Sequence, residues 1–268
     1  MKVKLFYLKL ILFISLTTKA ESNELLGSQY HCVVGISSFH SFNKFNPAST
    51  PDSNHNIFLV NTSPNIMGVD ELHFNEIYGK INVFNNIYTS LSYSGINNRL
   101  FTDNSIRIGF TYVANEMLQV GLEFNYNLYN VIGFTQQKFG GVSIGGKLKL
   151  DDKLYSAFIL RNLFKIDLVH YNILEEQLSS FGLAYILSEN LYIEVESIIN
   201  ISKSNALSLA VRYDIEKWLS ARMAYLSNPQ SILIGINLNL LEGSYLNYTV
   251  NKSNELGYSH SFGLSYLW

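Results

Sequence analysis

Apolar and polar residues alternate with a period of two over most of the chain that follows His73. Between Leu118 and Leu128, the even positions carry Leu, Val, Phe and Tyr, while most odd positions carry Gln, Glu or Asn. Because successive side chains of a β-strand point to opposite faces, this pattern predicts strands with one apolar and one polar face. The same alternation recurs over residues 142–150, 191–196, 207–213, 219–225 and 232–240.

The number of such segments is about twelve to fourteen, each close to the nine to eleven residues that a tilted membrane strand requires. We expect fourteen, since residues 230–240, 243–250 and 255–268 form three successive segments and an even total is typical of bacterial barrels. Hydrocarbon offers no hydrogen-bond partners to a sheet edge, so the sheet must close. The predicted fold is all-β: a closed antiparallel transmembrane β-barrel preceded by an irregular or plug segment.

One hairpin allows a prediction of register. Apolar residues occupy odd positions in both Leu207–Tyr213 and Leu219–Tyr225. Directly paired residues of antiparallel strands face the same side, so the connection must have an odd length. Asp214-Ile215-Glu216 is the predicted connection, with Tyr213 opposite Lys217.

The strands of a water-soluble β-sandwich would show the same alternation of apolar and polar residues. Composition separates a sandwich from a membrane barrel. Charged residues make up 15% of the chain, against roughly 25% in ordinary soluble domains, and aromatic residues reach 14%. The chain also ends on an apolar, aromatic alternation that includes Phe262, Leu264, Tyr266 and Trp268. Such an ending resembles the C-terminal assembly signal of outer-membrane barrels, which implies membrane lipid and the barrel-assembly machinery as partners.

The first twenty residues have the features of an export signal. Lys2, Lys4 and Lys9 precede the short apolar run of residues 10–16, and Thr18-Lys19-Ala20 fits a signal-peptidase site. We therefore expect a signal peptide over 1–20, a periplasmic or plug segment over 21–65, and the transmembrane barrel over 66–268. The expected location is the bacterial outer membrane.

Composition also excludes several kinds of site. The formal net charge of −2 provides no basic surface for nucleic acid. Cys32 is the only cysteine, so neither a disulfide framework nor a cysteine-built metal site is possible. The six histidines are dispersed without the spacing of a zinc motif. We expect no metal and no cofactor.

Charged residues on the polar faces are predicted to point into the barrel lumen. They could set the selectivity of a channel or pair with one another across the interior, and the second interpretation is favoured because polar interiors are the norm. The lumen-facing candidates are Glu123, Lys147, Lys149, Glu194, Glu196, Arg212 and Arg222.

An outer-membrane lipid hydrolase is the rival functional class. His260 lies on the predicted lipid-facing side, with Ser259 and Ser261 turned inward. Because neighbours in a strand point apart, a catalytic partner on the adjacent strand, such as Ser244, would be needed. No distinctive motif accompanies these residues, so the expected function is non-enzymatic.

Several short motifs carry a family resemblance. The stretch from Glu255 to Tyr266 resembles the C-terminal strand of PorV/PorQ-type barrels, which are distantly related to FadL-like fatty-acid transporters. Phe45-Asn46-Pro47-Ala48 resembles the NPA element that precedes their first strand. Arg161-Asn162-Leu163 and Phe181–Tyr185 are similar to the family's internal strands.

The sequence also departs from that pattern. Residues 35–40 replace the glycine-rich stretch expected ahead of the NPA element, and the chain is shorter than typical members. The resemblance implies a fourteen-stranded outer-membrane barrel that serves transport or type IX protein secretion. Its partner would then be a set of secretion-system proteins or, in a fatty-acid-like uptake channel, a hydrophobic small molecule.

Overall fold

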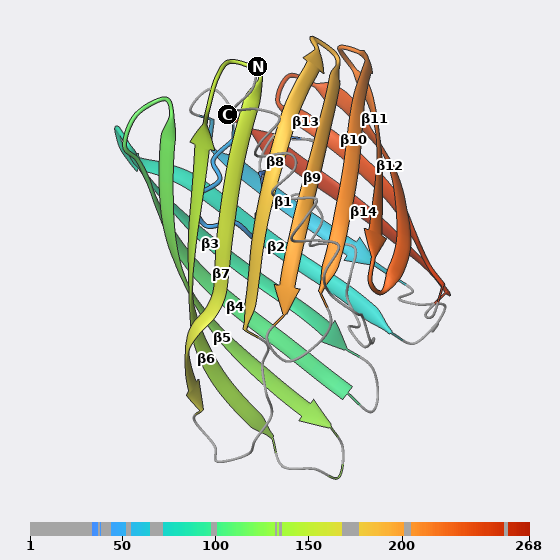
Figure 1. Cartoon of the computed structure of the whole chain (residues 1–268). Helices are drawn as coiled ribbons and strands as arrows, with labels where there is room; N and C mark the ends of the chain where they lie inside the picture. Colours follow the sequence, from blue (N-terminus) through green and yellow to red (C-terminus); the bar gives the residue numbers. More distant parts are fainter. Residues whose placement is uncertain are drawn as a thin grey trace.

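The computed structural model describes residues 34–36, 38, 44–51, 55–64, 72–97, 101–131, 133, 136–167, 177–200, 205–254 and 257–268. Fourteen antiparallel strands form a closed barrel in which each strand pairs with its neighbours in sequence and β1 pairs with β14 (Figure 1). No helix within the described residues is long and apolar enough to cross a membrane. The predicted fold class and strand number are therefore confirmed.

The strand bounds follow the alternation of the sequence. The strands are β1 (Ile57–Ser63), β2 (His73–Phe84), β3 (Ile87–Asn97), β4 (Phe101–Val113), β5 (Leu118–Val131), β6 (Gln137–Lys149), β7 (Leu154–Asp167), β8 (Leu178–Ser188), β9 (Leu191–Asn200), β10 (Ala206–Glu216), β11 (Leu219–Ser227), β12 (Gln230–Leu241), β13 (Ser244–Ser253) and β14 (Gly257–Leu267). The three C-terminal strands start and end within a few residues of the predicted segments.

The barrel begins earlier than the sequence pattern indicated. β1 starts at Ile57, inside the range 21–65 that was expected to precede the barrel. Its inward-facing Ile57 and Leu59 are apolar because they pack against Tyr78 and Leu267 inside the barrel. With Phe58 and Val60 on the outside, four apolar residues follow one another and the alternation is lost.

The prediction for the β10–β11 hairpin is wrong about which residues form the turn. It is right that an odd number of residues separates Tyr213 from its partner. Tyr213 pairs with Ala221 rather than with Lys217, and Glu216 pairs with Leu219. The turn is therefore Lys217-Trp218, and a bulge between Asp214 and Glu216 supplies the extra residue. This bulge keeps the odd-numbered apolar residues of both strands on one face.

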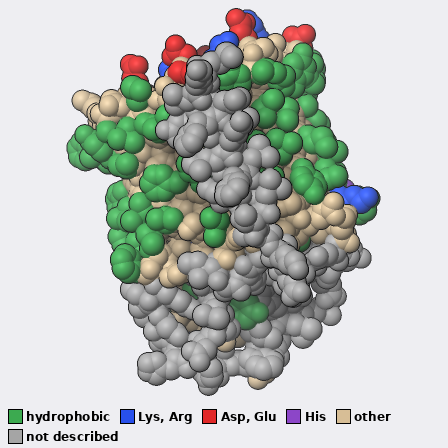
Figure 2. All heavy atoms as spheres, in the orientation of Figure 1, with side chains coloured by type: hydrophobic (Ala, Val, Ile, Leu, Met, Phe, Trp, Pro, Cys, Tyr) green, Lys and Arg blue, Asp and Glu red, His purple; other side chains and the backbone are tan. Residues whose placement is uncertain are grey.

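The outside of the barrel is apolar and the inside is polar. The outward side chains of Leu122, Phe124 and Ile234 are 36%, 46% and 57% exposed, whereas the inward Glu123 and Asn237 are buried. Hydrophobic side chains cover much of the outer wall (Figure 2). A soluble sandwich would have the opposite arrangement, so this is a lipid-facing barrel of the bacterial outer membrane.

The two ends of the barrel differ in their connections. Two-residue turns join β2 to β3, β8 to β9, β10 to β11 and β12 to β13 at one end, where the C-terminus also lies (Figure 1). The backbones of Asn56 and Trp268 are hydrogen bonded there, at 2.9 Å. Outer-membrane barrels have short periplasmic turns and longer extracellular loops, so the short-turn end is periplasmic.

The wall is irregular along β7, in its pairing with β6 and at the end of its pairing with β8. Val142 pairs with Phe164 but Ile144 pairs with Leu160, so β7 carries extra residues, and Asn162 there has a φ of 52°. The register between β7 and β8 stops at the pair of Arg161 with Leu178. The remaining extracellular part of β7 follows β6 and bends away from β8 (Figure 1).

Candidate functional site

The periplasmic half of the lumen holds part of the chain that precedes β1. The described residues 34–36, 38 and 44–51, here called the plug segment, lie inside the ring of strands (Figure 1). Val34 and Ala48 are completely buried, and Asn46 is nearly so. These residues lie within the range 21–65 predicted as a periplasmic or plug segment, whereas residues 57–63 of that range form β1 of the barrel wall.

The Asn46-Pro47-Ala48 turn rests on two glycines. Asn46 Oδ1 accepts a hydrogen bond from Ala48 N at 3.0 Å, and Ser49 N donates to Asn46 O at 2.9 Å, which closes the turn. Gly121 of β5 and Gly145 of β6 pair directly beneath it. A Cβ on Gly121 would lie 2.2 Å from Pro47 C, and one on Gly145 would lie 2.1 Å from Asn46 Oδ1. Only glycine leaves room for the turn at these positions.

Buried donors bind the carbonyl groups of this turn. Lys80 Nζ of β2 donates to Ser49 O at 2.5 Å and to Pro47 O at 3.4 Å. Thr111 of β4 also donates to Pro47 O and accepts from Lys80 at 2.7 Å. These bonds satisfy backbone oxygens that have no partner in secondary structure, and they compensate the burial of the ammonium group.

Three cationic groups lie close to the ring of Phe45. The guanidinium carbons of Arg107 and Arg161 lie 4.8 and 5.0 Å from the ring centroid, and Lys44 Nζ lies 5.0 Å from it. Arg161 also donates to Phe45 O at 3.2 Å. A phenyl ring is attracted to cations through its negative face, so this aromatic side chain is held in a polar lumen.

An ion pair ties the plug segment to β2. Lys44 Nζ contacts the buried carboxylate of Glu76, which also accepts from Asn61 Nδ2 at 2.9 Å. Burial lowers the pKa of the Lys44 ammonium below its ordinary value, and the attraction of Glu76 opposes that shift. Breaking this pair would leave Glu76 in the lumen without its cation.

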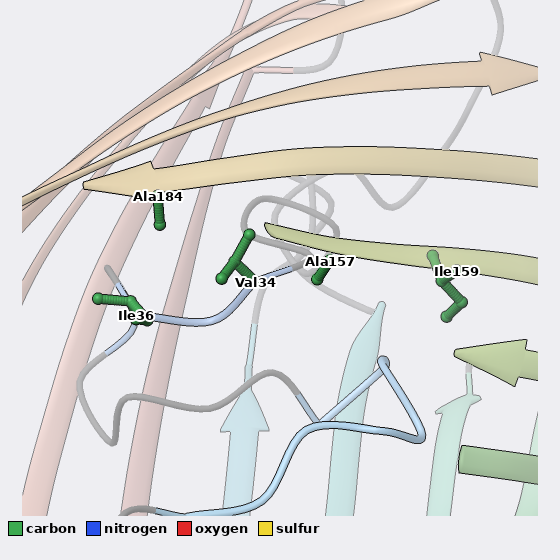
Figure 3. Close-up of a cluster of buried hydrophobic side chains, with 5 residues drawn as sticks. All are labelled: Val34, Ile36, Ala157, Ile159 and Ala184. Carbon is green, nitrogen blue, oxygen red and sulfur yellow. The ribbon is translucent and has the colours of Figure 1, made fainter. Parts of the chain in front are cut away.

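The start of the plug segment contacts the opposite wall. The amides of Val34 and Gly35 donate to Glu194 Oε1 at 2.7 and 3.2 Å, and Arg212 donates to the carbonyl of Ser38. Val34 and Ile36 form a buried apolar cluster with residues of β7 and β8, namely Ala157, Ile159 and Ala184 (Figure 3). The plug segment is thus bound by polar and apolar contacts together.

Most of the predicted lumen residues lie in the lumen. Glu123, Lys147, Glu194, Glu196 and Arg212 are all buried. Lys149 instead lies at the periplasmic end of β6 and pairs with the exposed Asp152 at 2.9 Å, while Arg222 is only half-buried. Of the seven, Glu194 and Arg212 bind the plug segment directly.

Several plug-binding residues were not among the sequence candidates. Glu76 and Lys80 share the inward face of β2, so the alternation there could have indicated them. Arg161 precedes the bulge in β7, where the alternation is interrupted. The Gly121–Gly145 pair depends on the register of β5 with β6, which no local pattern specifies.

The extracellular half of the lumen carries an apolar area on β8–β12, which we call the apolar lumen patch. Two clusters of buried side chains make it up: Leu178, Ile198 and Leu226, with the partly buried Ala206 packed against them, and next to these Ala210, Ala224 and Leu233. The pairing of Leu226 with Ser208 and of Ala210 with Ala224 places the two clusters on adjoining rows of the same wall. Leu178 is also the first residue of β8, where its pairing with β7 ends within the described residues.

The arrangement expected of a hydrolase is not formed by the proposed partners. His260 faces outward as predicted, but Ser244 pairs with Tyr266, near the other end of β14. Tyr248 is the neighbour of His260, with its hydroxyl 2.8 Å from His260 Nδ1. Among the described residues, no group of His, Cys, Asp and Glu side chains could hold a metal ion.

The C-terminal residues that resemble an assembly signal are on the outer surface. Phe262, Leu264, Tyr266 and Trp268 share the lipid-facing side of β14, and the rings of Tyr266 and Trp268 stack at a centroid distance of 5.7 Å. Their recognition by the assembly machinery stays a prediction.

Comparison with known proteins places the fold among outer-membrane barrels. No protein-family model matches the sequence, and no curated protein matches it. Similar solved structures include the toluene transporter TbuX of Ralstonia pickettii, with a TM-score of 0.60, 7% identity, and coverage of 83% of this chain and 92% of that chain. The toluene transporter TodX of Pseudomonas putida has a TM-score of 0.55 and 11% identity, covering 93% of this chain and 95% of that chain. At these identities the likeness concerns the fold alone.

Proposed function

We propose that this chain is a non-enzymatic outer-membrane transporter for small hydrophobic compounds. The observation that carries the proposal is the apolar lumen patch, which adjoins the place where β7 and β8 separate. An uncharged, apolar molecule that enters the lumen gains free energy by leaving water at this wall. The fold likeness to two toluene transporters supports the same class of substrate.

The plug segment makes an open water-filled pore a poor alternative. It lies in the periplasmic half of the lumen and is bound to β2, β4, β7, β9 and β10. Ions would have to pass a region where charged side chains already contact one another or the plug segment. A route for a hydrophobic solute is offered by the wall beside Leu178, where the pairing of β7 with β8 ends within the described residues.

Binding of an uncharged dye tests the proposal. The folded chain in detergent is titrated with phenylnaphthylamine, whose fluorescence rises in apolar surroundings. We expect saturable binding that is weakened about tenfold by Leu226→Gln, because an amide without a partner in an apolar site costs about 1–3 kcal/mol. Ser220→Ala, which alters another inward position of the same strand, is the matched control and should bind as the wild type does.

The outcome also separates the second candidate function. A secretion-associated scaffold, as the PorV/PorQ-type resemblance implies, has no need of an apolar lumen patch. It would co-purify with secretion proteins and bind the dye with the same affinity in wild type and in Leu226→Gln. That result would reject uptake of hydrophobic compounds and leave the scaffold as the better account.

A further inference from the structure

We propose that the outer surface of β13 and β14 binds a phosphate group of the glycolipid that forms the outer leaflet. The site consists of Tyr248, Lys252, Tyr258 and His260, and is called the Lys252 patch. It faces lipid rather than the lumen, so the inference is independent of what the barrel transports.

The position of the patch along β14 matches the edge of the membrane. Trp268 and Tyr258 mark the two ends of the lipid-facing side of this strand. Ten residues at about 3.3 Å each, tilted by about 40°, span roughly 25 Å, which is the height of the apolar band of such barrels. Because Trp268 is at the periplasmic end, Tyr258 lies at the level of the outer-leaflet head groups.

The side chains of the patch are close neighbours. Lys252 pairs with Tyr258 and Val250 with His260, so Lys252 and His260 are diagonal neighbours at roughly 7–8 Å between backbones. The ammonium of Lys252 lies 5.7 Å from the Tyr258 ring centroid. The hydroxyl of Tyr248 lies 2.8 Å from His260 Nδ1, and the two rings stack with their centroids 6.2 Å apart. This contact engages Nδ1 and leaves Nε2 as the second nitrogen of the imidazole for a ligand.

The positive charge of Lys252 favours an anion as the ligand of the Lys252 patch. The described outward-facing residues of β12, β13, β14 and β1 include no Asp or Glu, so no described residue of these strands offers the ammonium of Lys252 a carboxylate. A cation at the membrane interface is stabilised by anionic lipid groups. Phosphate accepts hydrogen bonds from both an ammonium and an imidazole, and the neighbouring tyrosine hydroxyls suit the sugar that carries it.

Lipid binding by the folded chain tests the site. Native mass spectrometry of the protein in detergent is used to titrate diphosphoryl lipid A, its dephosphorylated form and phosphatidylglycerol. We expect Lys252→Gln combined with His260→Gln to weaken binding of diphosphoryl lipid A at least fivefold, whereas Lys252→Arg retains it. Lys217→Gln, which removes an exposed lysine of a periplasmic turn, is the matched control and should leave binding unchanged.

Three outcomes overturn the proposal: equal binding of the dephosphorylated lipid, wild-type affinity in the double variant, or binding of phosphatidylglycerol that depends equally on Lys252. The last result would mean a general attraction for anionic lipid rather than a glycolipid site. Heat-dependent mobility on a gel shows whether each variant is folded. If the double variant does not fold, Lys252→Gln alone is used, and an affinity equal to that of Lys252→Arg contradicts the proposal.

Discussion

At the scale of single residues, the plug segment depends on glycines that leave room for its backbone and on a buried lysine that donates hydrogen bonds to it. Gly121 and Gly145 leave room for the Asn46-Pro47-Ala48 turn, and Lys80 supplies hydrogen bonds to its carbonyls. Such contacts combine steric fit with polar satisfaction, and either can be removed by one substitution. A few identifiable residues therefore hold the plug segment against the barrel wall.

Gly121→Val should displace the turn. Its Cβ would lie 2.2 Å from Pro47 C, a backbone atom that cannot move by rotation of a side chain. We expect a loss of about 1–3 kcal/mol in the binding of the plug segment to the wall, seen as ion conductance in planar bilayers where the wild type conducts little. Gly79→Ala, where the nearest atom is 4.0 Å away, is the control and should not conduct.

Lys80→Met should loosen the same turn without a steric clash. The carbonyl of Ser49 would lose its donor and Pro47 would keep only Thr111, at a cost of about 1–3 kcal/mol for an unsatisfied buried group. Hydrogen exchange of residues 44–51, followed by mass spectrometry, should become faster by about tenfold or more. Unchanged exchange in Lys80→Met would show that this lysine does not hold the plug segment.

At the scale of strands, alternation predicted those elements whose two faces meet different surroundings. β12 is the clearest example, because its outward isoleucines face lipid while Asn237 faces the lumen. β1 could not be found this way, since Ile57 and Leu59 pack inside the barrel and their face is as apolar as the other. The contacts of Phe45 in the lumen could not be predicted from the sequence either, because Phe45 lies outside the strands and the alternation of a strand says nothing about which arginines it meets.

The bulge in β7 gives a prediction at this scale. Asn162 has a φ of 52°, in the left-handed region that asparagine and glycine tolerate best. Asn162→Val should lower the free energy of unfolding by about 1–2 kcal/mol or more, because a β-branched residue is strained there. Asn162→Gly relieves the backbone but loses the hydrogen bond from Asn125 at 3.2 Å, so it should lie between wild type and valine. Urea unfolding in detergent gives the order, and a valine variant as stable as the glycine variant would contradict the strained bulge.

At the scale of the whole molecule, the membrane acts as the solvent and explains why the sheet closes and why its apolar face points outward. A ring of fourteen strands leaves no edge in hydrocarbon, and the pairing of β1 with β14 completes it. The exterior of this ring is apolar and its lumen is polar. The lumen holds the plug segment in its periplasmic half and the apolar lumen patch in its extracellular half. Sequence pattern predicted the two faces, whereas the register that brings β6, β7 and the plug segment together required the folded structure.

The central claim is that the apolar face of each strand contacts lipid and the polar face encloses the lumen. Spin labels are attached to single cysteines that replace Phe124, Ile234, Ser143 or Asn237 in a Cys32→Ser background, and the protein is placed in bilayers. Collision with oxygen, which dissolves in lipid, is measured against collision with a water-soluble nickel complex. Labels at 124 and 234 should favour oxygen strongly over nickel, and labels at 143 and 237 should not. Equal oxygen preference at all four positions, or a reversal between the two pairs, would contradict the account.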